Sequence, residues 1–247
     1  MKVIAINGSP RRNWNTAKLC QAALEGAAAA GAETELIHLE SMKFKGCMSC
    51  FRCHSVREYD TQVCYYKDEL TETLQKCMAA DAIIIGSPMY YGFATGDVRA
   101  FMERLMFPID TYEINKDGSR PIKLDRIIPT AMIYTMNAGG LPEKNQLNMN
   151  ESELRRMFGY SESHYAFDTC QFADYSKYKA NMFGAHHKAR RLEERFPIEV
   201  EQCKELGARL VQKAKDAQAG ILKREEMRFP LELLSMFQDE DDKLFEE

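Results

Sequence analysis

The chain contains 247 residues, of which 45% are hydrophobic and 28% are charged, and its net charge is −4. A chain of this length can form a domain that buries its own core without disulfide bonds. The slight negative charge argues against a nucleic-acid-binding protein, which would need a basic surface, and the lack of a long apolar run argues against a membrane-spanning protein.

The first residues, MKVIAING, predict a strand rather than a targeting segment. They lack the basic, apolar and small-residue order of a signal peptide, so we expect a cytoplasmic protein. Thiols stay reduced in that compartment. Clustered cysteines there more often bind metal or carry out redox chemistry than form structural disulfides.

Strands and helices are expected to alternate after this first strand. A helix is expected from about Thr16 to Ala30, ended by Gly31. Further strands are expected at ETELIHL, at DAIIIGSP, in IIPTAMIYTMNAGG and, more weakly, at HYAFDT. Pro129 cannot donate a ladder hydrogen bond, so the fourth strand should begin at or just after it. Helices are expected between these strands at DELTETLQKCMAA and GDVRAFMERLM.

This order predicts an α/β protein with a flavodoxin-like, doubly wound sheet of five parallel strands and right-handed crossovers. The continuous apolar character of DAIIIGSP suits a strand that is buried on both faces. We predict that this domain covers residues 1–185 and that it includes a cysteine-rich loop at residues 44–67.

The last third of the chain differs, and we predict a C-terminal helical extension at residues 186–247 that packs on the domain or on a partner subunit. Residues Arg195 to Ala217 are expected to form one long helix with Pro197 near its start, because apolar residues recur at three- and four-residue steps. The acidic end, QDEDDKLFEE, is expected to be a solvated terminus or an arm on a second subunit.

The first loop, GSPRRNWNTAKL, lies between a strand end and a helix start. Backbone N–H groups and the helix dipole attract phosphate at such a junction. The side chains that would add hydrogen bonds or charge are Ser9, Arg11, Arg12, Asn15 and Thr16. The loop matches neither the P-loop nor the Gly-x-Gly-x-x-Gly pattern. The alternative is therefore a polar loop with an ordinary helix cap, in which Trp14 either shields a phosphate or anchors the loop.

Two later loops follow strands at the sheet edge where doubly wound proteins bind ligands. In GSPMYYGFATGD, Pro88 stiffens the turn, Met89 and Tyr90 offer apolar and aromatic surface, and Gly92 permits close approach of the backbone. A flat ring system could lie against this loop, and in YTMNAGG backbone N–H groups would lie beside one edge of the same ring. The alternatives are aromatic side chains that fill the core, Tyr91 among them, and a flexible glycine turn.

Three stretches together resemble a known superfamily. GSPRRNWNT, GSPMYYG with VRAFMERL, and CMSCFRC upstream of KDEL resemble the NADPH-dependent FMN reductase and flavodoxin-like proteins, and they are most similar to the iron–sulfur flavoproteins. The resemblance covers roughly residues 1 to 140. It implies that the 1–185 domain binds FMN. The FMN-binding residues that it implies are Ser9, Arg11, Asn15, Thr16 and Ala17 at the phosphate, Pro88, Met89, Tyr90 and Gly92 at the isoalloxazine, and Asn137, Ala138 and Gly139 at the pyrimidine edge.

The same resemblance implies a role for CMSCFRC. The iron–sulfur flavoproteins hold a [4Fe–4S] cluster on a Cys-x2-Cys-x2-Cys motif and a fourth cysteine, which implies Cys47, Cys50, Cys53 and Cys64 as ligands. The gap of ten residues before Cys64 is longer than is usual in that family. Zinc also takes four thiolates, and free thiols in a simple FMN reductase are the third interpretation. The other four cysteines are expected to be small core residues.

The interpretation that follows is an FMN-dependent oxidoreductase or electron-transfer flavoprotein that pairs FMN with a [4Fe–4S] cluster, with NAD(P)H as a candidate donor. No side chain is assigned a catalytic role. We expect a small-molecule or protein redox partner and a homodimer or homotetramer, with no nucleic acid and no membrane. The alternatives are an FMN-only NAD(P)H-dependent reductase of a quinone, a flavin or another small acceptor, and a zinc-bearing regulatory module.

Overall fold

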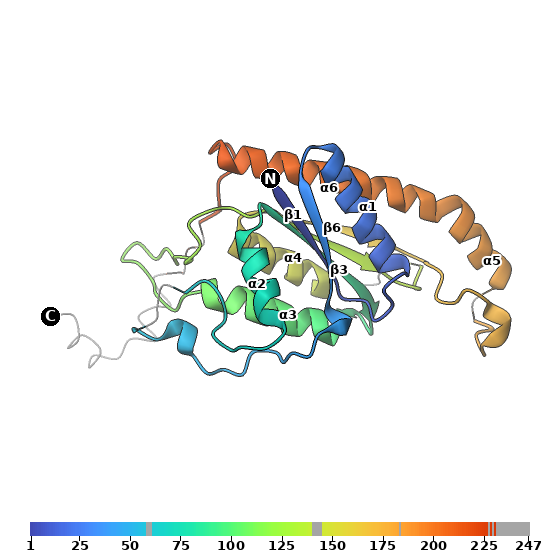
Figure 1. Ribbon diagram of the computed structural model, residues 1–247, viewed down its shortest axis with the longest axis horizontal. Coiled ribbons are helices and arrows are strands. Elements are labelled where there is room, and N and C mark those ends of the chain that lie inside the picture. The colour runs from blue at the N-terminus through green and yellow to red at the C-terminus, as the bar shows by residue number, and fades with distance from the viewer. Residues whose placement is uncertain (58–60, 140–144, 183, 227, 229, 231–247) are drawn as a thin grey trace.

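A parallel sheet with helices on both faces forms the centre of the molecule in this computed structural model, which describes residues 1–57, 61–139, 145–182, 184–226, 228 and 230 (Figure 1). Its strand order is β2-β1-β3-β5-β6, and every pairing along that path is parallel. These strands are β1 Lys2–Asn7, β2 Glu33–His38, β3 Ala82–Tyr90, β5 Thr130–Thr135 and β6 Ser161–Ala166. The predicted five-stranded, doubly wound parallel sheet is confirmed.

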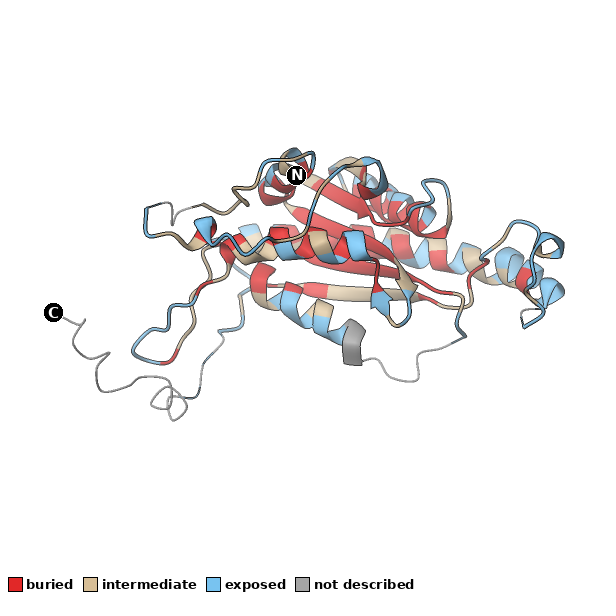
Figure 2. Cartoon of the chain, turned by 90° about the horizontal axis from the view of Figure 1, so that it is seen from below, coloured by how far each residue is buried: buried red, intermediate tan, exposed pale blue. Residues whose placement is uncertain are grey.

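The central strands separate two hydrophobic clusters because successive side chains point to opposite faces. On β3, Ile83 and Ile85 belong to the cluster under α2 Leu70–Ala79, α3 Gly96–Met106 and α4 Asn145–Phe158. Ile84 belongs to the cluster under α1 Asn15–Ala29 and α6 Phe196–Gln218. Both faces of the sheet are therefore covered, and the central strands are buried along most of their length (Figure 2).

The helix pair α1 and α6 is packed unusually closely. A Cβ atom added to Gly26 would lie 1.9 Å from the carbonyl oxygen of Lys204, and one added to Gly207 would lie 1.8 Å from that of Ala23. Only glycine permits this approach of two helix backbones. The C-terminal helix is thereby fixed on the sheet through α1, while the domain boundary placed at residue 185 stays a prediction.

The long helix predicted from Arg195 continues a helical segment that begins earlier in the chain. The segments α5 Ala185–Arg190, a π-helical turn at Arg191–Arg195 and α6 follow one another without a break. Among the described helices, none combines the length and the hydrophobicity that crossing a bilayer requires. The acidic end predicted at residues 238–247 lies outside the described residues.

Three local features of the structure differ from what the sequence indicated. Helix α4 was not predicted, although Leu154, Met157 and Phe158 at helical spacing are buried. Strand β6 begins at Ser161, three residues before HYAFDT, because the edge strand carries polar residues that do not suggest a buried strand. Tyr91 does not fill the core: its side chain is fully exposed.

The exposure of Tyr91 follows from a hairpin. Strand β3 pairs antiparallel with the short strand β4 Phe93–Ala94, joined by Tyr91 and Gly92. Both turn residues have positive φ, 52° for Tyr91 and 87° for Gly92, as a two-residue type I′ hairpin requires. Gly92 therefore serves the turn, and Tyr91 projects from its tip.

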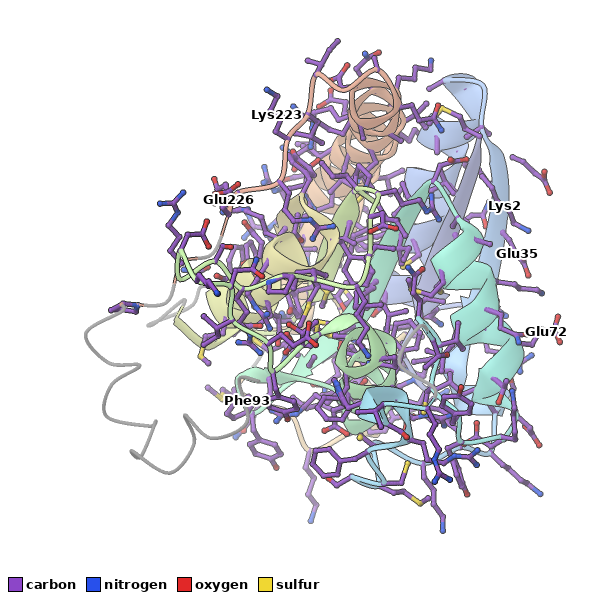
Figure 3. All side chains as sticks on the ribbon, turned by 90° about the vertical axis from the view of Figure 1, so that its left-hand side faces the viewer. Lys2, Glu35, Glu72, Phe93, Lys223 and Glu226 are labelled. Carbon is purple, nitrogen blue, oxygen red and sulfur yellow. The ribbon has the colours of Figure 1, made fainter. Side chains whose placement is uncertain are left out.

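The free edge of the sheet is charged. On β2, Glu35 forms ion pairs with Lys2 at 3.1 Å and with Lys76 of α2 at 2.8 Å, and Lys76 also pairs with Glu72 (Figure 3). These pairs are largely solvent-exposed and contribute little to stability. They place charge along an edge strand, which disfavours pairing with another chain.

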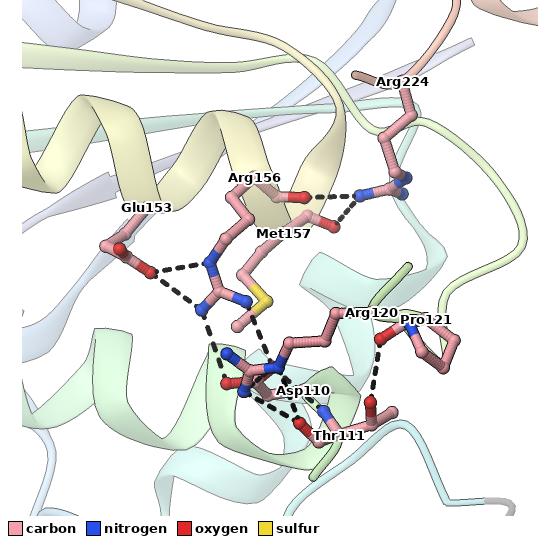
Figure 4. A network of polar contacts seen from close by, with 8 residues as sticks. All are labelled: Asp110, Thr111, Arg120, Pro121, Glu153, Arg156, Met157 and Arg224. Carbon is pink, nitrogen blue, oxygen red and sulfur yellow. Dashed lines mark hydrogen bonds and ion pairs between the residues drawn. The ribbon is translucent and has the colours of Figure 1, made fainter. Parts of the chain in front are cut away.

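The chain after α6 is anchored at the C-terminal end of α4. Arg224 Nη1 donates to the carbonyl oxygens of Arg156, at 2.8 Å, and of Met157 (Figure 4). Nearby, the Asp110 carboxylate accepts from Arg120 at 3.0 Å and from Arg156 at 3.1 Å. Burial lowers the pKa of Arg224. These contacts lie away from the carboxyl ends of the strands, where the predicted ligand loops meet.

Candidate functional site

A cavity of about 120 Å³ opens at the carboxyl ends of β1, β3 and β5. Eight of the predicted FMN-binding residues line it: Ser9, Arg11, Asn15, Thr16, Pro88, Met89, Tyr90 and Asn137. The other four, Ala17, Gly92, Ala138 and Gly139, do not line it. The sheet thus brings together residues that are far apart in the sequence. We call this cavity the strand-end cavity.

The start of α1 forms one wall of the strand-end cavity. Thr16 is buried, and its Oγ1 lies 2.8 Å from Oγ1 of Thr135 at the end of β5. Trp14 occupies the cap position of α1, and an indole can only donate hydrogen bonds, so it does not cap the first N–H groups. Those groups and the helix dipole leave a positive potential suited to a phosphate.

The loop that precedes α1 is tied to a segment that the sequence reading did not include. Arg11 Nη1 donates to the Gln171 carbonyl at 2.6 Å. Trp14 Nε1 and Asn15 Nδ2 donate to the Cys170 carbonyl at 3.0 and 2.7 Å. Trp14 therefore anchors the loop, and Arg11 and Asn15 each use a donor on the protein. No sequence motif around Cys170 predicts this contact, because the contact depends on where β6 places the segment that follows it.

A cluster of charged side chains holds that segment in place. The carboxylate of Asp168, whose φ is 55°, pairs with the buried Lys188, with His187 Nε2 at 2.5 Å and with Arg191 Nε at 3.1 Å. Burial raises the pKa of Asp168, but Lys188 and His187 outweigh it, and the net pKa is lowered. Lys188 Nζ also lies 3.4 Å from the carbonyl oxygen of Asn137. The loops after β5 and β6 are thus joined.

Asn137 leaves one acceptor for a ligand. Its Nδ2 donates to Gln171 Oε1 at 3.3 Å, whereas its Oδ1 is buried and has no hydrogen-bond partner among the described residues. Buried polar atoms are nearly always paired. An unpaired acceptor at the cavity wall, together with the uncapped helix start, fits a ligand that has a phosphate and a ring with an N–H group, as FMN has.

The four cysteines of the predicted metal site line one second cavity, which we call the cysteine pocket. Its volume is about 20 Å³, room for about one water molecule. Cys53 is buried, Cys47 and Cys64 are half-buried and Cys50 is exposed. Burial, reinforced by Cys64, raises the pKa of Cys53 to about 11.

The cysteine pocket contains the sulfur atoms that a metal centre needs, but these atoms are not arranged as metal ligands. Within the described residues, no three His, Cys, Asp or Glu side chains are arranged to hold a metal ion. The donor set of four thiols fits a cluster or a zinc ion. The remaining cysteines, Cys20, Cys77, Cys170 and Cys203, are buried as predicted.

The two cavities lie at opposite ends of α3. Thr95, at the N-terminus of α3, donates from Oγ1 to the Gly8 carbonyl at 3.0 Å, beside the first loop. Arg104, Phe107 and Pro108, at the C-terminal end, line the cysteine pocket. In Figure 1 the cysteine loop runs below α3 towards this second end. Because CMSCFRC follows the second strand, the sequence predicts that the cysteine loop lies at the sheet edge with the other ligand loops; its cysteines line a pocket at the C-terminal end of α3 instead.

Comparisons with known proteins identify the family and the fold. Residues 1–147 match the family described as NADPH-dependent FMN reductase. An iron-sulfur flavoprotein of Methanocaldococcus jannaschii is 38% identical over 104 residues, which are 42% of this chain and 51% of that protein. One of Archaeoglobus fulgidus is also 38% identical over 104 residues, covering 42% of this chain and 48% of that protein. The chain thus spans about half the length of these relatives.

Among solved structures, a flavone reductase superposes with a TM-score of 0.58 at 17% identity, covering 91% of this chain and 66% of that one. At that identity the similarity is evidence for the shared flavodoxin-like fold and for nothing finer. The family match ends at residue 147, whereas the superposition with the flavone reductase covers 91% of the chain.

Proposed function

This chain belongs to the NADPH-dependent FMN reductase family, and from that premise we propose that it is an FMN-dependent oxidoreductase whose cysteine pocket carries a [4Fe–4S] cluster. The observation that carries the FMN proposal is the strand-end cavity, in which eight residues expected at FMN line one space. The names of the iron-sulfur flavoprotein relatives support the cluster, as does the gathering of four thiols on one cavity.

Each wall of the strand-end cavity has a proposed role. The N–H groups at the start of α1, with the hydroxyls of Ser9 and Thr16, bind the phosphate. Pro88, Met89 and Tyr90 lie against the ring. Asn137 Oδ1 accepts a hydrogen bond from the ring edge. Arg11 contributes charge while it holds the segment after β6 in place.

The chemistry comes from the cofactors. FMN exchanges one or two electrons, and a cluster exchanges one, so together they would join a two-electron donor such as NAD(P)H to a one-electron carrier. The side chains bind, orient and shield these groups, and none is assigned as a nucleophile or a general base. A small molecule or a redox protein is the proposed partner.

Anaerobic purification tests this proposal. We expect an FMN spectrum, with cluster absorbance and about four irons and four sulfides per chain after reconstitution. Protein with FMN but neither iron nor sulfide would favour the second candidate, an FMN-only reductase. The observation behind that candidate is that the described thiols are not arranged around one point. Zinc alone, without FMN, would favour the regulatory module.

We also propose a homodimer or homotetramer in the cytoplasm. The exposed aromatic side chains at the β3–β4 hairpin, Tyr90, Tyr91 and Phe93, supply apolar surface beside the strand-end cavity. All eight cysteines are free thiols, as suits a reducing compartment. Sedimentation at micromolar concentration tests the oligomer, and a monomer alone would contradict it.

A further inference from the structure

Arg104, on α3, is a fully buried arginine that lines the cysteine pocket. Its side chain is 0% exposed, and it forms an ion pair with Asp68 at 2.6 Å. A buried guanidinium is costly unless its donors are satisfied. Its position beside four thiols therefore needs an explanation that goes beyond packing.

Two of the guanidinium nitrogens hold the ends of the cysteine loop. Nη1 donates to the carbonyl oxygen of Lys45 at 3.1 Å, just before Cys47. Nη2 donates to the carbonyl oxygen of Tyr66 at 2.7 Å, just after Cys64. One side chain thus joins the two chain segments that enter and leave the loop.

The third nitrogen is not satisfied in this way. Arg104 Nε is buried and has no hydrogen-bond partner in the part of the chain that the structure describes. Leaving a buried donor unpaired costs about 1–3 kcal/mol. Because the residue lines the cysteine pocket, sulfur is the acceptor at hand.

The charge of Arg104 is maintained despite its burial. An arginine guanidinium stays protonated in proteins, and Arg104 is held in an ion pair with the Asp68 carboxylate. A cation is therefore fixed beside Cys64. A thiolate, a thiolate-bound metal and a cluster all carry negative charge that such a cation stabilises.

We propose that Arg104 is a positioning residue of the metal centre: it closes the cysteine loop at both ends and stabilises negative charge on the sulfur atoms, with Nε–H donating to the sulfur of Cys64 or to an inorganic sulfide. This deepens the proposed function and, for the cluster, rests on it. If Arg104 only held the loop in place, its charge would not affect the midpoint potential of the cluster.

The test uses the Asp68→Asn background, so that removal of Arg104 leaves no unpaired buried carboxylate. Asp68→Asn is compared with Asp68→Asn/Arg104→Gln and Asp68→Asn/Arg104→Lys in the full chain. Arg99→Gln is the matched control, because Arg99 is an exposed arginine on the same helix. FMN content and thermal unfolding report whether each variant is folded.

In reconstituted protein, the readout is the midpoint potential of the cluster. Reduction adds negative charge, so loss of the cation should lower the potential. We expect at least a tenfold decrease in the equilibrium constant for one-electron reduction in the Gln variant, which is about 59 mV. The Lys variant should recover most of this difference, and Arg99→Gln should not change it. Equal midpoint potentials in Asp68→Asn and Asp68→Asn/Arg104→Gln would mean that Arg104 only holds the loop in place.

A second arm does not need a cluster. Apoprotein of the same variants is titrated with Cd²⁺, which thiolates bind with an ultraviolet charge-transfer band. We expect about tenfold weaker binding in the Gln variant and recovery with Lys. Wild-type protein that takes up no iron would overturn the cluster but leave this arm in force, and equal Cd²⁺ affinities in all variants would overturn the proposal itself.

Discussion

The two ends of α3 show two ways of building a site. At its N-terminal end, the strand-end cavity is made from the ends of parallel strands and the start of α1, and a buried Thr16–Thr135 contact joins two of these elements. At its C-terminal end, the cysteine pocket is made from a loop that contains two non-glycine residues with positive φ, Ser49 and Phe51. The first site is fixed by the sheet, whereas the second depends on side chains such as Arg104.

Because the two sites are built from different elements, we expect a substitution in one site to leave the other unchanged. A change in the cysteine loop should leave FMN binding intact, because it reaches no strand of the sheet. A change in α1 or in the loops at the strand ends should leave the thiols unaffected. Each of the following predictions tests that separation.

The largest effect is expected at Cys50. In reconstituted Cys50→Ser, iron should fall from about four per chain to below one, because a cluster needs its full set of thiolates. FMN should remain bound. Val56→Ser, an exposed residue of the same loop that does not line the cysteine pocket, is the control and should keep its iron. Loss of FMN together with iron would show that the sites are not separate.

The next effect is expected at Thr16. Thr16→Val keeps the shape of the side chain but removes the hydroxyl that we propose binds the phosphate, so FMN affinity should fall by about 1.5–3 kcal/mol, the range for a hydrogen bond to a charged group. Fluorescence titration measures it, with Thr34→Val on β2 as control. Unchanged affinity would remove Thr16 from the phosphate site, and altered iron content would break the comparison.

A smaller effect on stability is expected at the α1–α6 contact. Gly207→Ala places a methyl group against the Ala23 carbonyl, and such overpacking costs about 1–3 kcal/mol. Urea unfolding measures the loss, with the exposed Glu205→Ala as control. FMN affinity should fall slightly because α1 shifts, whereas Cd²⁺ binding should not. A stability equal to that of wild type would mean that the helices separate without cost.

The smallest effect is expected at Asp168, and it depends on pH. The folded pKa of Asp168 is lowered, so its ion pairs stabilise the protein above the unfolded pKa of about 3.9. That stabilisation is lost as the pH falls through the folded pKa. Asp168→Asn should cost about 1 kcal/mol at neutral pH after solvent screening, and the difference from wild type should vanish once the pH lies below the lowered folded pKa. A difference that stays constant with pH would contradict the prediction.

The sequence predicted the sheet and most of the strand-end cavity for one physical reason. In a doubly wound sheet, loops after parallel strands meet at one edge, so GSPRRNWNT and GSPMYYG could be brought together from chain order alone. The continuous apolar run at Ile83–Ile85 indicated a strand buried on both faces, and the two core clusters confirm it.

What the sequence did not predict depends on contacts between distant segments. The carbonyl oxygens of Cys170 and Gln171 engage Trp14 and Arg11, and a carbonyl group has no residue signature. The cysteine loop was expected at the sheet edge, but Arg104 and Glu103 hold it farther along α3; Cys47 N donates to Glu103 Oε2 at 3.1 Å. A buried arginine cannot be distinguished from a surface arginine in VRAFMERL, because its partners lie 36 to 59 residues away.

The contact between the first loop and the Cys170 carbonyl also bears on how the protein is made. Asn15 and Cys170 are 155 residues apart, so a ribosome has released the first loop long before its partner has been synthesised. At about 5–20 residues per second, that interval lasts roughly 8 to 30 seconds. Throughout it, β1 and α1 lack both this contact and the cover of α6. If FMN binds in the strand-end cavity as proposed, the nascent chain can retain it firmly only after about seven tenths of the 247 residues have emerged, and cofactor loading is then a late event in its biogenesis.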